Sequence, residues 1–176
     1  MKLHLGCGKK FLPGYTHIDI IGYEHVDYVS DISELSFIEN NTVEEIYACH
    51  VLEHFKQNQI DKVLKEWYRI LKNNGVLRIS VPNFKAIVEQ YQKTNNLTQL
   101  LGLLYGGQTY NYNYHHVVFD FKLLCEILTD NGFTEVVHYD WRNFLPKDYD
   151  DYSKAYIPHM DFENGKLMSL NISGKK

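Results

Sequence analysis

The stretch Leu3-His4-Leu5-Gly6-Cys7-Gly8 decides the fold, together with the Asp19 of His17-Ile18-Asp19-Ile20. A short apolar strand leads into a glycine turn, and a second apolar strand ends on a carboxylate eleven residues after Gly8. Glycines let a ligand approach the backbone closely, and a carboxylate at this place accepts hydrogen bonds from ribose hydroxyls. The pattern therefore predicts a binding turn for a nucleoside.

Strand-like apolar runs alternate with helical patterns along the rest of the chain, which favours βαβ units and a parallel sheet. Seven strands are expected, over Lys2–Leu5, Thr16–Ile20, Asp27–Val29, Glu45–Ala48, Val76–Val81, Thr134–Asp140 and Leu167–Ile172. The last two are joined by a loop without a helical stripe, so we expect them to be antiparallel. Only about ten residues separate the first two strands, which leaves little room for a crossover helix. The first helix is therefore expected to be reduced or absent.

Apolar stripes at helical spacing predict the helices. The clearest stripe consists of Ile60, Val63, Leu64, Trp67, Ile70 and Leu71, and Asn73-Asn74-Gly75 is expected to end that helix. Further helices are expected at about Phe84–Tyr91, over Leu97–Leu104, and from an N-cap at Asp120 to a stop at Asn131-Gly132. Two segments fit neither pattern, about 105–116 and 141–164, and are expected to be irregular substrate or lid segments.

Length and composition predict one domain over residues 1–176, with 44% hydrophobic and 23% charged residues. A net charge of −4 gives no global reason to bind nucleic acid. No signal peptide or membrane span is apparent, and Cys7, Cys49 and Cys125 lack the spacing of a disulfide framework or zinc site. We therefore expect a cytoplasmic protein that binds neither nucleic acid nor membrane.

The glycine turn does not suit a dinucleotide. A dinucleotide site has GxGxxG at the start of a helix whose N-terminus binds the pyrophosphate. Here Phe11 occupies the third glycine position, and the acid arrives earlier than the spacing of about 20 residues typical of such sites. S-adenosylmethionine carries a ribose and an adenine but no phosphate, so it needs the glycines and the acid but no helix N-terminus.

At this point the chain resembles the class I S-adenosylmethionine-dependent methyltransferases, in particular the small methyltransferase-11-like bacterial group. The matching pieces lie in family order across nearly the whole chain: the two segments at Gly6–Gly8 and Asp19, then Val26–Ile32, His50–Phe55, Ile70–Ile79 and Gly132-Phe133. The resemblance implies an α/β, Rossmann-like, doubly wound sheet of seven mostly parallel strands. Its strand order would be 3-2-1-4-5-7-6, with the last strand antiparallel.

The resemblance also implies a cofactor site. Gly6 and Gly8 would flank the methionine part with Cys7 offering only its backbone, and Asp19 would bind the ribose hydroxyls. Asp31 and the Ile32 backbone would meet the adenine amino edge. The full cofactor-binding set is Gly6, Cys7, Gly8, Asp19, Ile20, Asp31, Ile32 and His50. The alternatives are a tight turn at the glycines and a simple N-cap at Asp31.

Methyl transfer from a sulfonium requires an aligned nucleophile and, for a hydroxyl, removal of a proton. A histidine suits that role because its pKa lies near operating pH. The catalytic candidates are His50, His115 and His116, with His54 nearby; a solvated loop is the alternative for the adjacent pair. No metal is expected. Some relatives that read Glu-x-x-Glu-His here bind a divalent ion, so the alternative is a metal site of His50, Glu53 and His54, with His115 or His116.

The expected function is methyl transfer from S-adenosylmethionine to a small-molecule acceptor, giving S-adenosylhomocysteine. Tyrosines and Trp141 in the two irregular segments, with Asp148, Asp150 and Asp151, favour a sugar, polyol or amine, and hence an O-methyl transfer to a sugar or glycan precursor. The alternative for these tyrosine-rich segments is that they cover the core or form dimer contacts. The alternative is an inactive S-adenosylmethionine-binding module or partner subunit. Because the first helix is reduced, we expect segments far along the chain to cover the cofactor.

Overall fold

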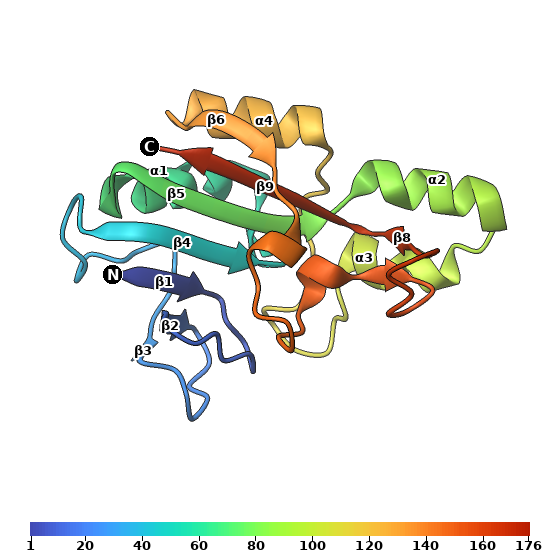
Figure 1. Cartoon of the computed structure of the whole chain (residues 1–176), viewed down its shortest axis with the longest axis horizontal. Helices are drawn as coiled ribbons and strands as arrows, with labels where there is room; N and C mark the ends of the chain where they lie inside the picture. The colour runs from blue at the N-terminus through green and yellow to red at the C-terminus, as the bar shows by residue number, and fades with distance from the viewer.

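One seven-stranded sheet forms the centre of the computed structural model, which describes residues 1–176 (Figure 1). Its order is β3-β2-β1-β4-β5-β9-β6. The strands are β1 (Lys2–Leu5), β2 (Thr16–Asp19), β3 (Tyr28–Val29), β4 (Val43–Cys49), β5 (Leu71–Pro82), β6 (Thr134–His138) and β9 (Ser169–Lys175). The first five pair in parallel, whereas β9 runs antiparallel to both β5 and β6. The expected order and the antiparallel last strand are confirmed.

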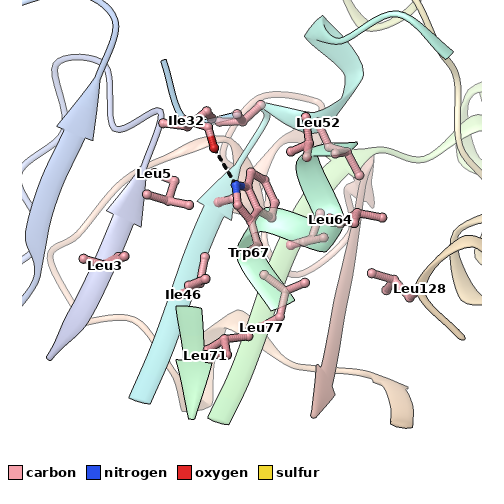
Figure 2. Close-up of a cluster of buried hydrophobic side chains, with 14 of the residues drawn as sticks. Leu3, Leu5, Ile32, Ile46, Leu52, Leu64, Trp67, Leu71, Leu77 and Leu128 are labelled. Atoms are coloured by element: carbon pink, nitrogen blue, oxygen red, sulfur yellow. Dashed lines mark hydrogen bonds between the residues drawn. The ribbon is translucent and has the colours of Figure 1, made fainter. Parts of the chain in front are cut away.

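Two amphipathic helices cover one face of this sheet. The helices of the chain are α1 (Ile60–Ile70), α2 (Phe84–Thr94), α3 (Leu101–Tyr105) and α4 (Phe121–Asp130). The predicted stripe of α1, together with Leu124 and Leu128 of α4, packs on the sheet in one buried cluster that includes Leu3, Ile46 and Leu77 (Figure 2). At its centre the fully buried Trp67 donates a hydrogen bond from Nε1 to the carbonyl of Ile32 at 2.9 Å, which ties α1 to the turn after β3.

No helix lies between β1 and β2, as the short spacing predicted. The chain instead makes turns from Gly6 to Tyr15, and the amide of Gly6 donates to the carbonyl of Ile18 at 2.8 Å. The face that such a helix would cover carries a second cluster, built from Leu12, Tyr47, Leu145 and Tyr149. Most of that cover comes from residues 141–154, the orange segment in front of the sheet in Figure 1.

A buried polar network attaches this covering segment to the sheet. The Tyr47 hydroxyl donates to Asp151 Oδ2 at 2.5 Å, and Asp151 Oδ1 accepts from the backbone and hydroxyl of Ser153. Asn171 of β9 donates to the Ser153 carbonyl at 3.0 Å and accepts from Ser80 at 2.7 Å. Because buried polar groups need partners, this closed network fixes where the segment lies.

Several element boundaries differ from the predictions. Asn73-Asn74-Gly75 does not end α1: the helix stops at Ile70, and the fully buried Leu71 is already extended and pairs with Val43. The asparagines lie in β5 instead, where Asn74 adopts a φ of 63° beside a register shift against β4. The last strand begins at Ser169 rather than Leu167.

Several short elements complete the fold. The 3₁₀ turns Trp141–Asn143 and Tyr152–Lys154 and the strand β7 (Tyr156–Ile157) lie in the second irregular segment, and β7 pairs with β8 (Lys166–Leu167) just beyond it. Further 3₁₀ turns are Leu52–His54, Gln57–Gln59 and Thr98–Leu100. With α2 and α3 the β7–β8 pair forms a third small cluster beyond the carboxyl end of β5, at the right of Figure 1. None of the helices has the length and apolar character needed to cross a bilayer.

Candidate functional site

A cavity of about 390 Å³ opens at the carboxyl ends of β1, β2 and β4. This is where an open α/β sheet presents its ligand site, and the volume lies in the range of small-molecule pockets. Seven of the eight predicted cofactor-binding residues line the cavity: Gly6, Gly8, Asp19, Ile20, Asp31, Ile32 and His50. The eighth, Cys7, is buried, and its sulfur lies 3.7 Å from the Gly8 carbonyl oxygen and 3.8 Å from His25 Nε2.

Asp19 holds the glycine turn through its carboxylate. Oδ2 accepts a hydrogen bond from the Gly8 amide at 2.7 Å, and Oδ1 accepts one from the Ile21 amide at 2.8 Å. Each carboxylate oxygen has a second lone pair, so both can still accept from a ligand in the cavity. Asp19 therefore joins β2 to the turn after β1 and presents two acceptors at fixed positions.

Both glycines are required by the backbone. Gly6 has a φ of 62° and Gly8 a φ of 54°, in the left-handed region that side chains rarely adopt. A Cβ atom on Gly6 would lie 2.5 Å from Cγ2 of Val51, whereas one on Gly8 would meet no atom within 4 Å. The space over Gly8 is thus open, which leaves its backbone accessible to a ligand.

Asp31 caps a turn and also reaches the cavity. Its Oδ1 accepts from the Ser33 amide at 2.8 Å, so the capping interpretation describes one of its two oxygens. Its Oδ2 makes no protein hydrogen bond, and the residue is exposed at the cavity edge. Both interpretations of Asp31 thus fit its position.

His50 follows β4 with a φ of 53°, a strained conformation for a residue other than glycine. Its Nε2 lies 2.8 Å from the Ser169 hydroxyl, and that hydroxyl donates its one proton to the carbonyl of Tyr152. Nε2 of His50 must therefore carry the proton in this contact. Burial lowers the pKa of His50 to about 3, with His115 and His54 adding to the shift. The ring is thus neutral and its position is fixed.

Glu53 lies beneath His50 and is fully buried, yet neither of its oxygens has a hydrogen-bond partner. Nδ1 of His50 lies 3.4 Å from Oε1, and Nε2 of His115 lies 4.0 Å from the same atom. Burial raises the pKa of the Glu53 carboxyl to about 8 and lowers that of His115 to about 4. A buried carboxyl group without donors is costly and therefore unusual.

The other histidines differ in what they face. His54 and His116 line the cavity, whereas His115 does not. The His115 ring is held by the Leu103 carbonyl at 3.0 Å from Nδ1. His116 is exposed; its backbone amide donates to the Glu53 carbonyl at 2.8 Å, but its ring makes no hydrogen bond. Among the three predicted catalytic histidines, His116 alone combines cavity access with a free imidazole.

Sequence reasoning missed several residues that line the cavity, among them Asn111, Lys56 and Gln59. Tyr110 and Tyr112, which form the far wall with Asn111, belong to the tyrosines of the first predicted irregular segment. That segment therefore borders the cavity. Trp141, Tyr149 and Tyr156 of the second segment instead pack into other clusters and do not line the cavity.

The residues present fit S-adenosylmethionine and do not fit a dinucleotide. No helix follows the glycine turn, so no helix N-terminus lies where a pyrophosphate would bind. The open backbone at Gly8 and the two acceptors of Asp19 remain, and these suit a nucleoside without phosphate. This agrees with the cofactor that the resemblance implies.

The comparisons with known proteins agree with this geometry. A family model described as a methyltransferase domain matches residues 9–79. No curated protein matches the chain.

Three solved structures illustrate the shared fold. An S-adenosylmethionine-dependent methyltransferase from Archaeoglobus fulgidus has 17% identity and a TM-score of 0.60, over 99% of this chain and 85% of that one. One from Thermotoga maritima, described as a possible histamine N-methyltransferase, has 15% identity and a TM-score of 0.58, over 99% and 81%. The 1,6-didemethyltoxoflavin-N1-methyltransferase of Burkholderia thailandensis, solved with 1,6-didemethyltoxoflavin and S-adenosylhomocysteine, has 15% identity and a TM-score of 0.59, over 99% and 70%. At these identities the likeness shows the fold.

Proposed function

We propose that this chain, which has the fold of the class I S-adenosylmethionine-dependent methyltransferases and a methyltransferase domain matched over residues 9–79, transfers a methyl group to a hydroxyl of a small-molecule acceptor. The observation that carries the proposal is the cavity that joins the Gly6–Gly8 turn and Asp19 to the free imidazole of His116. A nucleoside site and a proton acceptor therefore border the same space.

The chain's own residues would hold the cofactor from three strand ends. Asp19 would accept the ribose hydroxyls, Asp31 would accept from the adenine amino group, and the backbone at Gly6 and Gly8 would border the methionine part. When bound, S-adenosylmethionine supplies a methyl group on a sulfonium, which is already activated for displacement. The protein therefore mainly orients the two partners and manages one proton.

His116 is the residue that we assign to that proton. His50 is poorly suited as a base, because Ser169 occupies its Nε2 and the ring is buried. His116 lines the cavity and its ring has no hydrogen-bond partner, so it can accept a hydroxyl proton as the methyl group is transferred. His50 would then form a wall of the site that orients the reactants.

The acceptor-facing wall favours a neutral, polyhydroxylated molecule such as a sugar or glycan precursor. Tyr110, Asn111, Tyr112 and Gln59 supply hydroxyl and amide groups that can donate or accept, and Lys56 is the one cationic side chain that lines the cavity with them. Aromatic faces beside hydroxyl and amide groups suit a sugar ring. The three cysteines are free, which fits the reducing cytoplasm in which we place the enzyme.

The test is release of S-adenosylhomocysteine during incubation with sugars, phenols and amines. We expect transfer to a hydroxyl acceptor, and a His116→Ala variant should lose about 10²- to 10⁴-fold in kcat while still binding S-adenosylhomocysteine. The matched control is His159→Ala, an exposed histidine outside the cavity, which should keep full activity.

Two results would contradict the proposal. Binding of S-adenosylhomocysteine without transfer to any acceptor would support an inactive binding module. Transfer to amines alone, with no effect of His116→Ala, would refute the hydroxyl acceptor and the role of the base.

A further inference from the structure

A carboxylate without partners lies next to the cavity. Glu53 is in the short turn Leu52–His54 that follows β4, and its side chain has no exposed surface. Neither Oε1 nor Oε2 receives a hydrogen bond. Buried carboxylates in proteins are hydrogen-bonded, paired with a cation or bound to a metal. The protein donates a hydrogen bond to neither oxygen, so both oxygens remain available to a cation.

Two imidazoles adjoin this carboxylate, and the backbone orients both. Nδ1 of His54 lies 3.1 Å from the Tyr114 carbonyl, and Nδ1 of His115 lies 3.0 Å from the Leu103 carbonyl. A carbonyl can only accept, so each Nδ1 carries a proton and each neutral ring has its lone pair on Nε2. Metal-binding histidines are held in this way, with the second nitrogen donating to a carbonyl or carboxylate.

The three side chains converge. Nε2 of His115 lies 4.0 Å from Oε1 of Glu53, and the His54 and His115 rings are 4.8 Å apart in an edge-on arrangement. One ligand atom from each residue lies within 4.8 Å of the other two. The three side chains thus converge without a hydrogen bond between His115 and Glu53, since 4.0 Å exceeds hydrogen-bond length.

We propose that Glu53, His54 and His115 bind one divalent transition-metal ion such as Zn²⁺. Two imidazole nitrogens and one carboxylate oxygen suit zinc or another borderline metal, whereas Mg²⁺ prefers oxygen ligands and retains its water. This set differs from the sequence-based alternative, because His115 rather than His50 converges with Glu53 and His54. Three protein ligands leave a position open to water or to a ligand.

His54 is the link between the ion and the cavity. It lines the cavity and also belongs to the cluster, so the open position would lie near the proposed acceptor space. Only this last step rests on the proposed function, since the metal site itself is defined without S-adenosylmethionine.

The experiment is a metal titration of the full chain, free of any polyhistidine tag and stripped with a chelator. Calorimetry with Zn²⁺ should give one ion per chain, and Co²⁺ should develop the visible absorption of a low-coordinate site. Glu53→Gln and His115→Asn should each weaken Zn²⁺ binding by more than about 100-fold, because even residues behind the ligands contribute 10- to 100-fold. All measurements are made without S-adenosylmethionine.

The matched control is His116→Asn, which changes the neighbouring histidine outside the cluster and should leave Zn²⁺ affinity unchanged. Thermal unfolding in chelator verifies that each variant is folded, and Zn²⁺ should raise the melting temperature of the parent chain but not of the Glu53→Gln variant. The proposal would be overturned if the folded parent chain did not bind Zn²⁺. It would also be overturned if the Glu53→Gln and His115→Asn variants bound Zn²⁺ as tightly as the parent chain. If the parent chain binds S-adenosylhomocysteine in a separate titration but does not bind Zn²⁺, the metal site is refuted and the proposed function is unaffected.

Discussion

Replacing Asp19 by asparagine should strongly weaken binding at the proposed cofactor site while lowering the stability of the fold only moderately. The carboxylate accepts from the Gly8 amide at 2.7 Å and the Ile21 amide at 2.8 Å, and an asparagine has only one oxygen to offer. Hydrogen bonds to charged groups contribute about 1.5–3 kcal/mol each, so losing one amide contact should lower the free energy of unfolding by about 2 kcal/mol. Losing the two hydrogen bonds that we propose with the ribose hydroxyls should cost about 3–6 kcal/mol of binding, or 10²- to 10⁴-fold in Kd.

The assay is calorimetric titration with S-adenosylhomocysteine, paired with urea denaturation. Asp27→Asn is the matched control, because Asp27 Oδ2 also accepts a backbone hydrogen bond, from His17 at 2.7 Å, but lies outside the cavity. The control should lose a similar or smaller amount of stability and bind S-adenosylhomocysteine as the parent chain does. If Asp19→Asn keeps the parent Kd, or if NADH binds where S-adenosylhomocysteine does not, the assignment of this carboxylate is wrong.

The two turn glycines and the buried tryptophan give further predictions. Gly6→Ala should lower the free energy of unfolding by about 2–4 kcal/mol, because backbone strain at a φ of 62° adds to an overlap of the new Cβ with Val51 at 2.5 Å. Gly8→Ala should cost only about 1 kcal/mol, since its Cβ meets no atom within 4 Å; equal losses in urea denaturation would contradict the contrast. Trp67→Phe leaves the Ile32 carbonyl without its 2.9 Å donor and should cost about 2–3 kcal/mol, so a loss under 1 kcal/mol would show that this contact contributes little.

The sequence predicted the parts of the fold that depend on local pattern. Most strands follow from short apolar runs, whereas their order was implied by the family resemblance; the α1 stripe from Ile60 to Ile70 packs on the sheet as expected. The end of α1 was mispredicted because Asn74-Gly75 is a strong local stop signal, whereas pairing of Leu71 with Val43 ends the helix earlier. Tertiary pairing here overrides a local signal, and such contacts are not visible in a single sequence.

The candidate site likewise contains residues that the sequence predicted and side-chain orientations that it did not. Gly6, Gly8 and Asp19 were singled out because each lies within a few residues of a strand end, and strand ends meet at one edge of a parallel sheet. Asp31 was implied by the family resemblance, and all four residues line the cavity. His115 was predicted as a catalytic candidate, yet its ring turns toward Glu53 and away from the cavity. The direction of a loop side chain depends on which carbonyl holds it, in this case that of Leu103, which lies 12 residues earlier in the chain.

The missing first helix explains what each irregular segment does. Without that helix, the sheet face at Tyr47 needs another cover, and residues 141–154 provide it through Leu145 and the Tyr47–Asp151 hydrogen bond. Side chains committed to that packing cannot also close over an acceptor. The wall of the cavity is left to the segment around Tyr110 and Tyr112, both of which are exposed. Acceptor selectivity should therefore be determined by this first segment, whereas changes at Leu145 or Asp151 should act on stability.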